Sequence, residues 1–69
     1  MQYYQDNQGN IWEVNFKNFW IDRVTNSLLL EGRIIGNGEE FTSVSIQYLR
    51  SNCKRISKEE AQENKQKIN

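Results

Sequence analysis

The chain has 69 residues, of which 36% are hydrophobic and 12% aromatic, and nine basic side chains balance nine acidic ones. This length supports one domain, and the composition is too rich in aromatic residues for a disordered chain, so a single small folded domain is predicted. The absence of histidine excludes a Ser-His-Asp triad, a Cys-His dyad and imidazole ligands for a metal, which are the commonest catalytic and metal-binding arrangements.

The first two predicted strands cover residues 2–5 and the segment that starts at Ile11. Residues 6–10 between them are rich in Asn and Gly, which tolerate the left-handed backbone of tight turns. From Ile11 the side chains alternate between apolar and polar, the period-2 pattern of a half-buried strand. Asn18 interrupts this pattern, and the apolar run at residues 19–21 predicts a bulge or a sharp bend. The alternating residues are Trp12, Val14 and Phe16 on one face and Glu13, Asn15 and Lys17 on the other.

The middle of the chain predicts further strands. Residues 25–27 form a turn signal, and residues 28–35 read as a strand that is apolar on both faces. Residues 36–38 predict a hairpin turn rather than a phosphate-binding loop, since a strand pattern and not a helix follows them. From Glu39 the chain resumes in extended form as far as Leu49, and we expect Val44, Ile46 and Tyr48 to form its buried face. Residues 48–52 are expected to tighten into one helical turn, and residues 53–56 to return as a short strand.

The end of the chain predicts a polar helix. Ser57 and Glu60 form a capping box, in which the Ser57 hydroxyl accepts from the backbone N–H of Glu60, so the helix should begin at Lys58. Between residues 58 and 69 the only apolar side chains are Ala61 and Ile68. No apolar stripe exists to dock this helix, and we therefore expect it to be frayed and exposed to solvent.

These elements predict a mainly β fold. We expect a small antiparallel sheet of four to five strands, curled or closed as an SH3-like barrel, with a short polar C-terminal helix. A plain meander is the alternative. Residues 1–57 would form the single β domain and residues 58–69 the helical tail.

Cysteine and carboxylate patterns exclude further chemistry. Cys53 stands alone, so we expect a small half-buried apolar side chain rather than a thiol activated by Lys54 and Arg55. The carboxylates are scattered with no pairing in their spacing, and we expect neither enzyme activity nor a cofactor or metal. A single free thiol fits a reducing compartment. Since the chain shows no apolar leader and no apolar run near about 18 residues, we expect a cytoplasmic protein that does not enter a membrane.

The neutral total hides an uneven distribution of charge. Residues 1–49 carry three basic and six acidic side chains, a net charge of −3, whereas residues 50–69 carry six basic and three acidic ones, a net charge of +3. The segment 50–58 holds four cations and no anion, which predicts contact with phosphate or with an acidic partner. These cations are Arg50, Lys54, Arg55 and Lys58.

Three strand segments, at residues 19–21, 28–30 and 34–35, carry large apolar residues on both faces of the expected sheet. One face forms the core, so the other face needs a cover. Three alternatives stay open: the sheet curls until it covers itself, a second copy covers it in a homo-oligomer, or a different protein does. The residues expected to anchor such a surface are Tyr3, Tyr4, Trp12, Trp20 and Leu29.

Together these features predict a small non-enzymatic protein-binding module that self-associates and acts as a stoichiometric regulator or inhibitor. Size and composition point to a phage or prokaryotic accessory protein acting on a host factor. The alternative is a binder of nucleic acid or of a small nucleotide, with aromatic rings stacking on bases and basic side chains facing phosphate. A third alternative is a structural subunit of a larger assembly. The basic side chains for nucleotide binding would be Arg23, Arg33, Arg50, Lys54 and Arg55.

Overall fold

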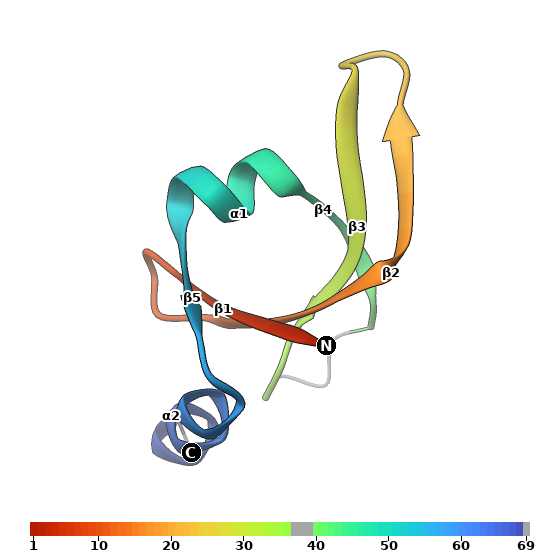
Figure 1. The fold of residues 1–69 in the computed structure, drawn as a ribbon. Coiled ribbons are helices and arrows are strands. Elements are labelled where there is room, and N and C mark those ends of the chain that lie inside the picture. The colour runs from red at the N-terminus through yellow and green to blue at the C-terminus, as the bar shows by residue number, and fades with distance from the viewer. Residues whose placement is uncertain (37–39, 69) are drawn as a thin grey trace.

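The computed structural model describes residues 1–36 and 40–68, which form a curled five-stranded antiparallel sheet with two helices (Figure 1). The strand order is β4-β3-β2-β1-β5, so the first four strands follow one another as a meander and the last strand returns beside the first. The predicted curled antiparallel sheet with a short C-terminal helix is confirmed. Because β4 and β5 remain as edges, the barrel is half open. The elements are β1 (Gln2–Asp6), β2 (Ile11–Asp22), β3 (Ser27–Ile34), β4 (Thr42–Ser45), α1 (Ile46–Asn52), β5 (Cys53–Ile56) and α2 (Lys58–Ile68).

The turn between β1 and β2 is organised by the carboxylate of Asp6. One oxygen accepts hydrogen bonds from the backbone N–H groups of Gln8 and Asn10, both at 2.9 Å. The other accepts from the Asn10 side-chain amide at 3.2 Å and from the Trp12 indole N–H at 3.1 Å. Gly9 occupies a positive φ of 86° in this turn, a conformation that glycine adopts without steric cost. The predicted turn at residues 6–10 is therefore present, with Asp6 as its centre.

Strand β2 is divided by the bulge that the sequence predicts. Asn15 lies opposite Glu31, and the next residue pair in register is Phe19 with Leu30, so residues 16–18 have no opposite partner on β3. The first half of β2 pairs with β1 on one side and with β3 on the other. The second half pairs with β3 only, and together these two segments extend beyond the rest of the sheet.

The core consists of two clusters, one on each face of the sheet. The concave-face cluster has Leu49 of α1 in its centre, and the convex-face cluster has Ala61 of α2. Figure 1 shows the two helices on opposite sides of β1 and β5, as this division requires. The concave-face cluster comprises Val14, Leu30, Val44 and Leu49, with Tyr4, Trp12, Ile46 and Cys53 packed around it. The convex-face cluster comprises Ile11, Ile56 and Ala61, with Tyr3 and Ile35 packed around it.

The expectation of extended chain as far as Leu49 is wrong, because α1 begins at Ile46. The Ser45 hydroxyl accepts the backbone N–H of Tyr48 at 3.0 Å and so caps the helix. Helical spacing then turns Leu49 into the core and leaves Tyr48 exposed. The expected buried face is therefore correct for Val44, correct in part for Ile46, which packs at the edge of the concave-face cluster, and wrong for Tyr48. The short strand at residues 53–56 is confirmed.

Helix α2 begins at Lys58, as the capping box predicts, and the Ser57 hydroxyl accepts the N–H of Glu60 at 3.1 Å. The expectation that nothing docks this helix is wrong for its first turns, because Ala61 is 0% exposed and packs with Ile11 and Ile56. Among residues 58–63 of α2, whose side chains the structure describes, Ala61 is the buried one. The division into a domain at residues 1–57 and a tail stays a prediction.

Of the predicted turn at residues 36–38, only Gly36 lies within the described residues. Its φ of 99° is in the left-handed region that glycine favours. Asn37, Gly38 and Glu39 lie outside the described residues, and with them the rest of that turn and the expected start of the next strand.

Candidate protein-binding site

The extension formed by residues 16–30, here called the arm, is the most apolar exposed part of the described chain. It consists of the second half of β2, the loop at residues 23–26 and the first half of β3, and it stands upright at the right of Figure 1. The arm accounts for the elongated shape of the molecule, whose principal extents are 38 × 22 × 18 Å.

Register places the apolar side chains of the arm on both of its faces. Trp20 lies opposite Leu29, and because opposed residues in an antiparallel pair share a face, these two side chains are neighbours. Phe19 lies opposite Leu30 and Ile21 opposite Leu28, on the other face. Of this second set Leu30 is buried in the concave-face cluster, whereas Phe19 and Ile21 extend beyond it.

These large apolar side chains are exposed to solvent over much of their surface. Phe19 and Ile21 are each 62% exposed and Trp20 is 44% exposed. Val24 at the tip of the loop is 94% exposed. At the base of the arm, Phe16 is 36% exposed in the bulge. Neither core cluster includes any of these five side chains, so they stay exposed on both faces of the arm, whereas Leu30 at its base is buried.

Local hydrogen bonds hold the tip of the arm in place. The backbone N–H of Val24 donates to the Asp22 carboxylate at 3.0 Å, and Asn26 adopts a positive φ of 57°, which asparagine tolerates better than most residues. The amide of Asn18 donates to the Glu31 carboxylate at 3.1 Å and ties the bulge to β3. The loop therefore presents Val24 to solvent in a defined conformation.

The five residues expected to anchor a partner separate into two groups in the structure. Trp20 and Leu29 are brought together on one face of the arm. Tyr4 and Trp12 pack against the concave-face cluster, and Tyr3 packs against the convex-face cluster. Sequence reasoning did not single out Phe19, Ile21 and Val24 as anchors, although the apolar run after Asn18 was the available signal for the first two.

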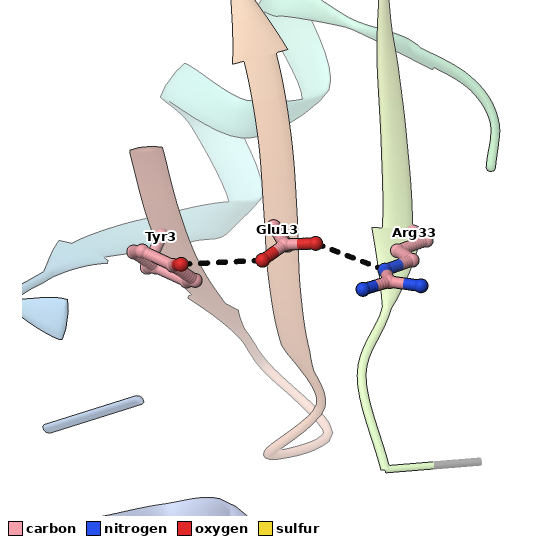
Figure 2. Close-up of polar contacts among 3 residues, drawn as sticks. All are labelled: Tyr3, Glu13 and Arg33. Carbon is pink, nitrogen blue, oxygen red and sulfur yellow. Dashed lines mark hydrogen bonds and ion pairs between the residues drawn. The ribbon is translucent and has the colours of Figure 1, made fainter. Parts of the chain in front are cut away.

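A polar cluster of Tyr3, Glu13 and Arg33 crosses three strands on the convex face (Figure 2). The Tyr3 hydroxyl donates to the Glu13 carboxylate at 3.2 Å, and the Arg33 Nε donates to its other oxygen at 2.9 Å. Burial raises the pKa of Tyr3, and the hydrogen bond and negative charge of Glu13 raise it further. The Arg33 guanidinium also lies 4.6 Å from the centre of the Phe41 ring. Both oxygens of the carboxylate have a donor, so the cluster joins β1, β2 and β3.

The four cations of the segment 50–58 are exposed but do not form one patch. Lys54 lies opposite Gln5 and Arg55 opposite Tyr4, so these neighbouring side chains point to opposite faces of the sheet. Arg50 lies in the last turn of α1, on a different element. Arg55 and Lys58 line a shallow hollow of about 340 Å³ together with Met1, Gln2, Tyr3, Ile56 and Ser57.

The environment of Cys53 is not that of an activated thiol. The side chain is half-buried, as expected. Burial raises its pKa, the negative charge of Asp6 raises it further, and a hydrogen bond with Tyr48 acts in the opposite direction. The net effect is a pKa above the ordinary value, which keeps the thiol protonated and weakly nucleophilic at neutral pH.

Within residues 1–36 and 40–68, no cluster of three or more cysteine, aspartate or glutamate side chains is arranged to bind a metal ion. Neither helix of this part of the chain has the length and apolar character needed to span a membrane. No protein-family model, no curated protein and no solved structure matches the chain. The functional assignment therefore rests on the surface of the molecule, and the arm is its most distinctive feature.

Proposed function

We propose that this chain is a small non-enzymatic protein-binding module that self-associates through the arm and acts as a stoichiometric regulator or inhibitor of the protein it binds. The observation that carries the proposal is the exposure of Phe19, Trp20, Ile21 and Val24 on one extension of the sheet. Aromatic side chains such as those of Phe19 and Trp20 are enriched in protein interfaces, and Trp is among the residues that contribute most to binding energy.

The area of the arm supports this role. A buried aromatic side chain covers about 200 Å² and a buried aliphatic one about 100 Å². With their exposed fractions, the five apolar side chains of the arm leave about 450 Å² uncovered. This area is divided between two faces, with Phe19 and Ile21 on one and Trp20 on the other, and its total equals that of the largest apolar patches on typical monomers, about 300–600 Å², which are often functional.

A second copy of the chain is a suitable occupant of this surface because of its charge. The charged side chains on and beside the arm are Lys17, Asp22, Arg23 and Glu31, two of each sign. Two arms therefore meet without net repulsion, whereas a strongly charged protein would gain nothing from this neutral surface.

The test is the mass of the protein in solution, measured by sedimentation or light scattering from about 1 μM to 1 mM, a range that spans weak and strong homodimers. We expect an assembly larger than a monomer, and we expect Trp20→Ala combined with Leu29→Glu to weaken it at least about 30-fold, as the loss of one central anchor does. Phe41→Ala is the matched control, because Phe41 is an exposed aromatic residue outside the arm. A monomer throughout the range, or an unchanged mass for the double variant, contradicts the proposal.

A second candidate function, binding of a phosphate-bearing nucleic acid or nucleotide, is favoured by one observation. Arg55 and Lys58 share the hollow beside Ser57, and the residues that line it include no acidic side chain. Titration with a single-stranded oligonucleotide and with ATP at low salt tests this candidate. Binding that weakens with added salt and with Arg55→Gln supports it, and flat titrations with both ligands eliminate it.

A further inference from the structure

The arm has one long free edge, and it belongs to β2. β1 pairs with β2 only from Ile11 to Val14, and within the described residues no strand pairs with the outer side of β2 beyond that point. On the other side of the arm, β4 pairs with β3 as far as Leu29, which leaves only residues 27 and 28 free. A new strand can therefore add to the arm along β2.

Part of this edge is already protected by the bulge. The backbone N–H of Lys17 donates to the Asn15 side chain at 3.0 Å, and residues 16–18 are out of register with β3. Bulges and lysines are the means by which edge strands avoid unwanted pairing. Residues 19–21 have regular pairing to β3 and carry neither a bulge nor a charge, so the unprotected edge coincides with the apolar side chains Phe19, Trp20 and Ile21.

We propose that two copies of the chain pair antiparallel along this edge of β2, around a two-fold axis at Trp20. The inference rests on the proposed self-association and specifies its geometry. A two-fold axis perpendicular to a sheet leaves each side chain on its own face, and opposed residues must share a face, so a residue can oppose itself or a residue an even number of positions away.

A register centred on Trp20 satisfies this condition and places the axis at the middle of the apolar stretch of residues 19–21. Trp20 then lies opposite Trp20 of the second copy, on the face that carries Leu29. Phe19 lies opposite Ile21 of the second copy on the other face, and the reverse pair forms by symmetry. Aromatic and branched aliphatic side chains in direct cross-strand pairs are among the favourable combinations in antiparallel sheets. Asn18 faces Asp22 at each end of the pairing, a contact between an amide donor and a carboxylate.

The geometry also explains why association would stop at two copies. The same edge is used by both copies, so the pairing is closed and does not lead to a filament. It joins the two five-stranded sheets into one and removes the exposed edge from each arm. Phe19, Trp20 and Ile21 of the two copies carry together about 550 Å² of exposed apolar surface, of which the cross-strand pairs cover a part, so the dimer belongs to the class of small, weak interfaces.

A disulfide at the axis tests this register. Opposed Cα atoms in an antiparallel pair are about 4.5–5.5 Å apart, within the range that a disulfide bridges. In a Cys53→Ala background, Trp20→Cys should form a covalent dimer under mild oxidation. Leu29→Cys is the matched control, since it lies on the same face but one strand further from the axis. We expect the cross-linked fraction of Trp20→Cys to exceed that of Leu29→Cys at least about tenfold.

A second measurement covers the case in which loss of the Trp20 side chain itself weakens association. Equal amounts of isotope-labelled and unlabelled unsubstituted chain are mixed, and intermolecular nuclear Overhauser effects are recorded at a concentration where sedimentation shows the dimer. Contacts between residues 19 and 21 of different copies support the register. A dimer that shows neither these contacts nor the selective cross-link overturns the edge pairing and leaves self-association standing. A chain that stays monomeric overturns both.

Discussion

Removing the carboxylate of Asp6 should destabilise the fold more than any other single change to a polar side chain in the first hairpin. Asp6 is 9% exposed and accepts four hydrogen bonds, three within its own turn and one from Trp12. A hydrogen bond to a charged group contributes about 1.5–3 kcal/mol, but bonds that share one acceptor group do not add fully. We expect Asp6→Ala to lower the free energy of unfolding by about 3 kcal/mol, since it leaves the Trp12 N–H and two backbone N–H groups without their acceptor.

A loss of about 3 kcal/mol is a large fraction of the free energy of unfolding of so small a domain. At about 0.05–0.15 kcal/mol per residue, a domain of this length has a free energy of unfolding of about 3–10 kcal/mol. Asp6→Asn is the matched control, because it keeps the shape of the side chain and one carbonyl acceptor but loses the charge and the second acceptor. We expect it to cost about half as much as the alanine substitution.

The pH dependence of stability gives an independent measure of the same group. Burial raises the pKa of Asp6, but the hydrogen bonds from Trp12, Asn10 and Gln8 together lower it by more, so the pKa in the folded protein lies below the ordinary value of about 3.9. The unfolded chain therefore takes up the proton first. The stabilising contribution is complete above about pH 3.9 and is lost as the pH falls through the folded-state value.

Urea unfolding followed by tryptophan fluorescence at pH 7 and at pH 3 measures both effects. The unsubstituted chain should lose more stability between these pH values than Asp6→Asn, which has no carboxylate to protonate. The reasoning is refuted if Asp6→Ala costs less than about 1 kcal/mol, the net contribution of one ordinary hydrogen bond, or if Asp6→Asn shows the full pH dependence.

Three further substitutions test packing and capping by the same urea assay. A Cβ atom at Gly32 would lie 2.9 Å from the Val44 Cγ1, so Gly32→Ala should lower the free energy of unfolding by about 1–3 kcal/mol through overpacking. An unchanged urea midpoint would show that β3 and β4 move apart without loss of stability. Ser57→Ala removes the acceptor of the Glu60 N–H and should cost about 1 kcal/mol with a loss of helical circular dichroism; unchanged helicity would contradict the capping role. Ala61→Asp places a charge at a fully buried site and should cost about 3 kcal/mol or more, whereas a neutral result would mean that α2 does not dock on the sheet.

The strands of the fold could be predicted because their signals are local. The alternation from Ile11, the turn residues at 6–10 and the interruption at Asn18 each depend on neighbouring residues, and each corresponds to a feature of β1, β2 or the bulge. The same is true of the capping box at Ser57, whose hydrogen bond is present. Each of these features depends on interactions between residues that are close in sequence, so it can be predicted from a short segment.

The two errors arose where a contact distant in sequence decides the structure. The segment from Thr42 to Leu49 alternates well enough to continue as a strand, but Ser45 caps a helix, and Leu49 then fills the concave-face cluster beside Val14. Ala61 appeared too small to dock a helix, yet it packs where Ile11 and Ile56 meet. Periodicity along the chain cannot reveal either contact, because both depend on which strands become neighbours.

The sequence predicts that apolar side chains stay exposed on some strands, but it does not predict which of the expected anchor residues lie there. Apolar residues on both faces of residues 19–21 and 28–30 indicated a surface in need of cover, and the arm has this property. Tyr3, Tyr4 and Trp12 share the residue types of interface anchors, but they are used in packing the sheet. The residue type alone does not distinguish an aromatic side chain of the core from an exposed one. The position of the bulge does, because pairing between β1 and β2 stops just before it.

The way in which the helices cover the sheet is the physical basis of the proposed contact between the arm and a second molecule. Each helix packs on one face of the inner sheet, α1 through Leu49 and α2 through Ala61. Both faces of the sheet are therefore covered by the chain itself where β1, β2 and β3 lie side by side. Beyond the bulge β1 no longer pairs with β2, and Leu30 is the last side chain of the concave-face cluster, whereas Phe19 and Ile21 are each 62% exposed. Since neither helix covers these side chains, burial of the arm requires contact with another chain, and the free edge of β2 offers that chain backbone hydrogen bonds as well as an apolar surface.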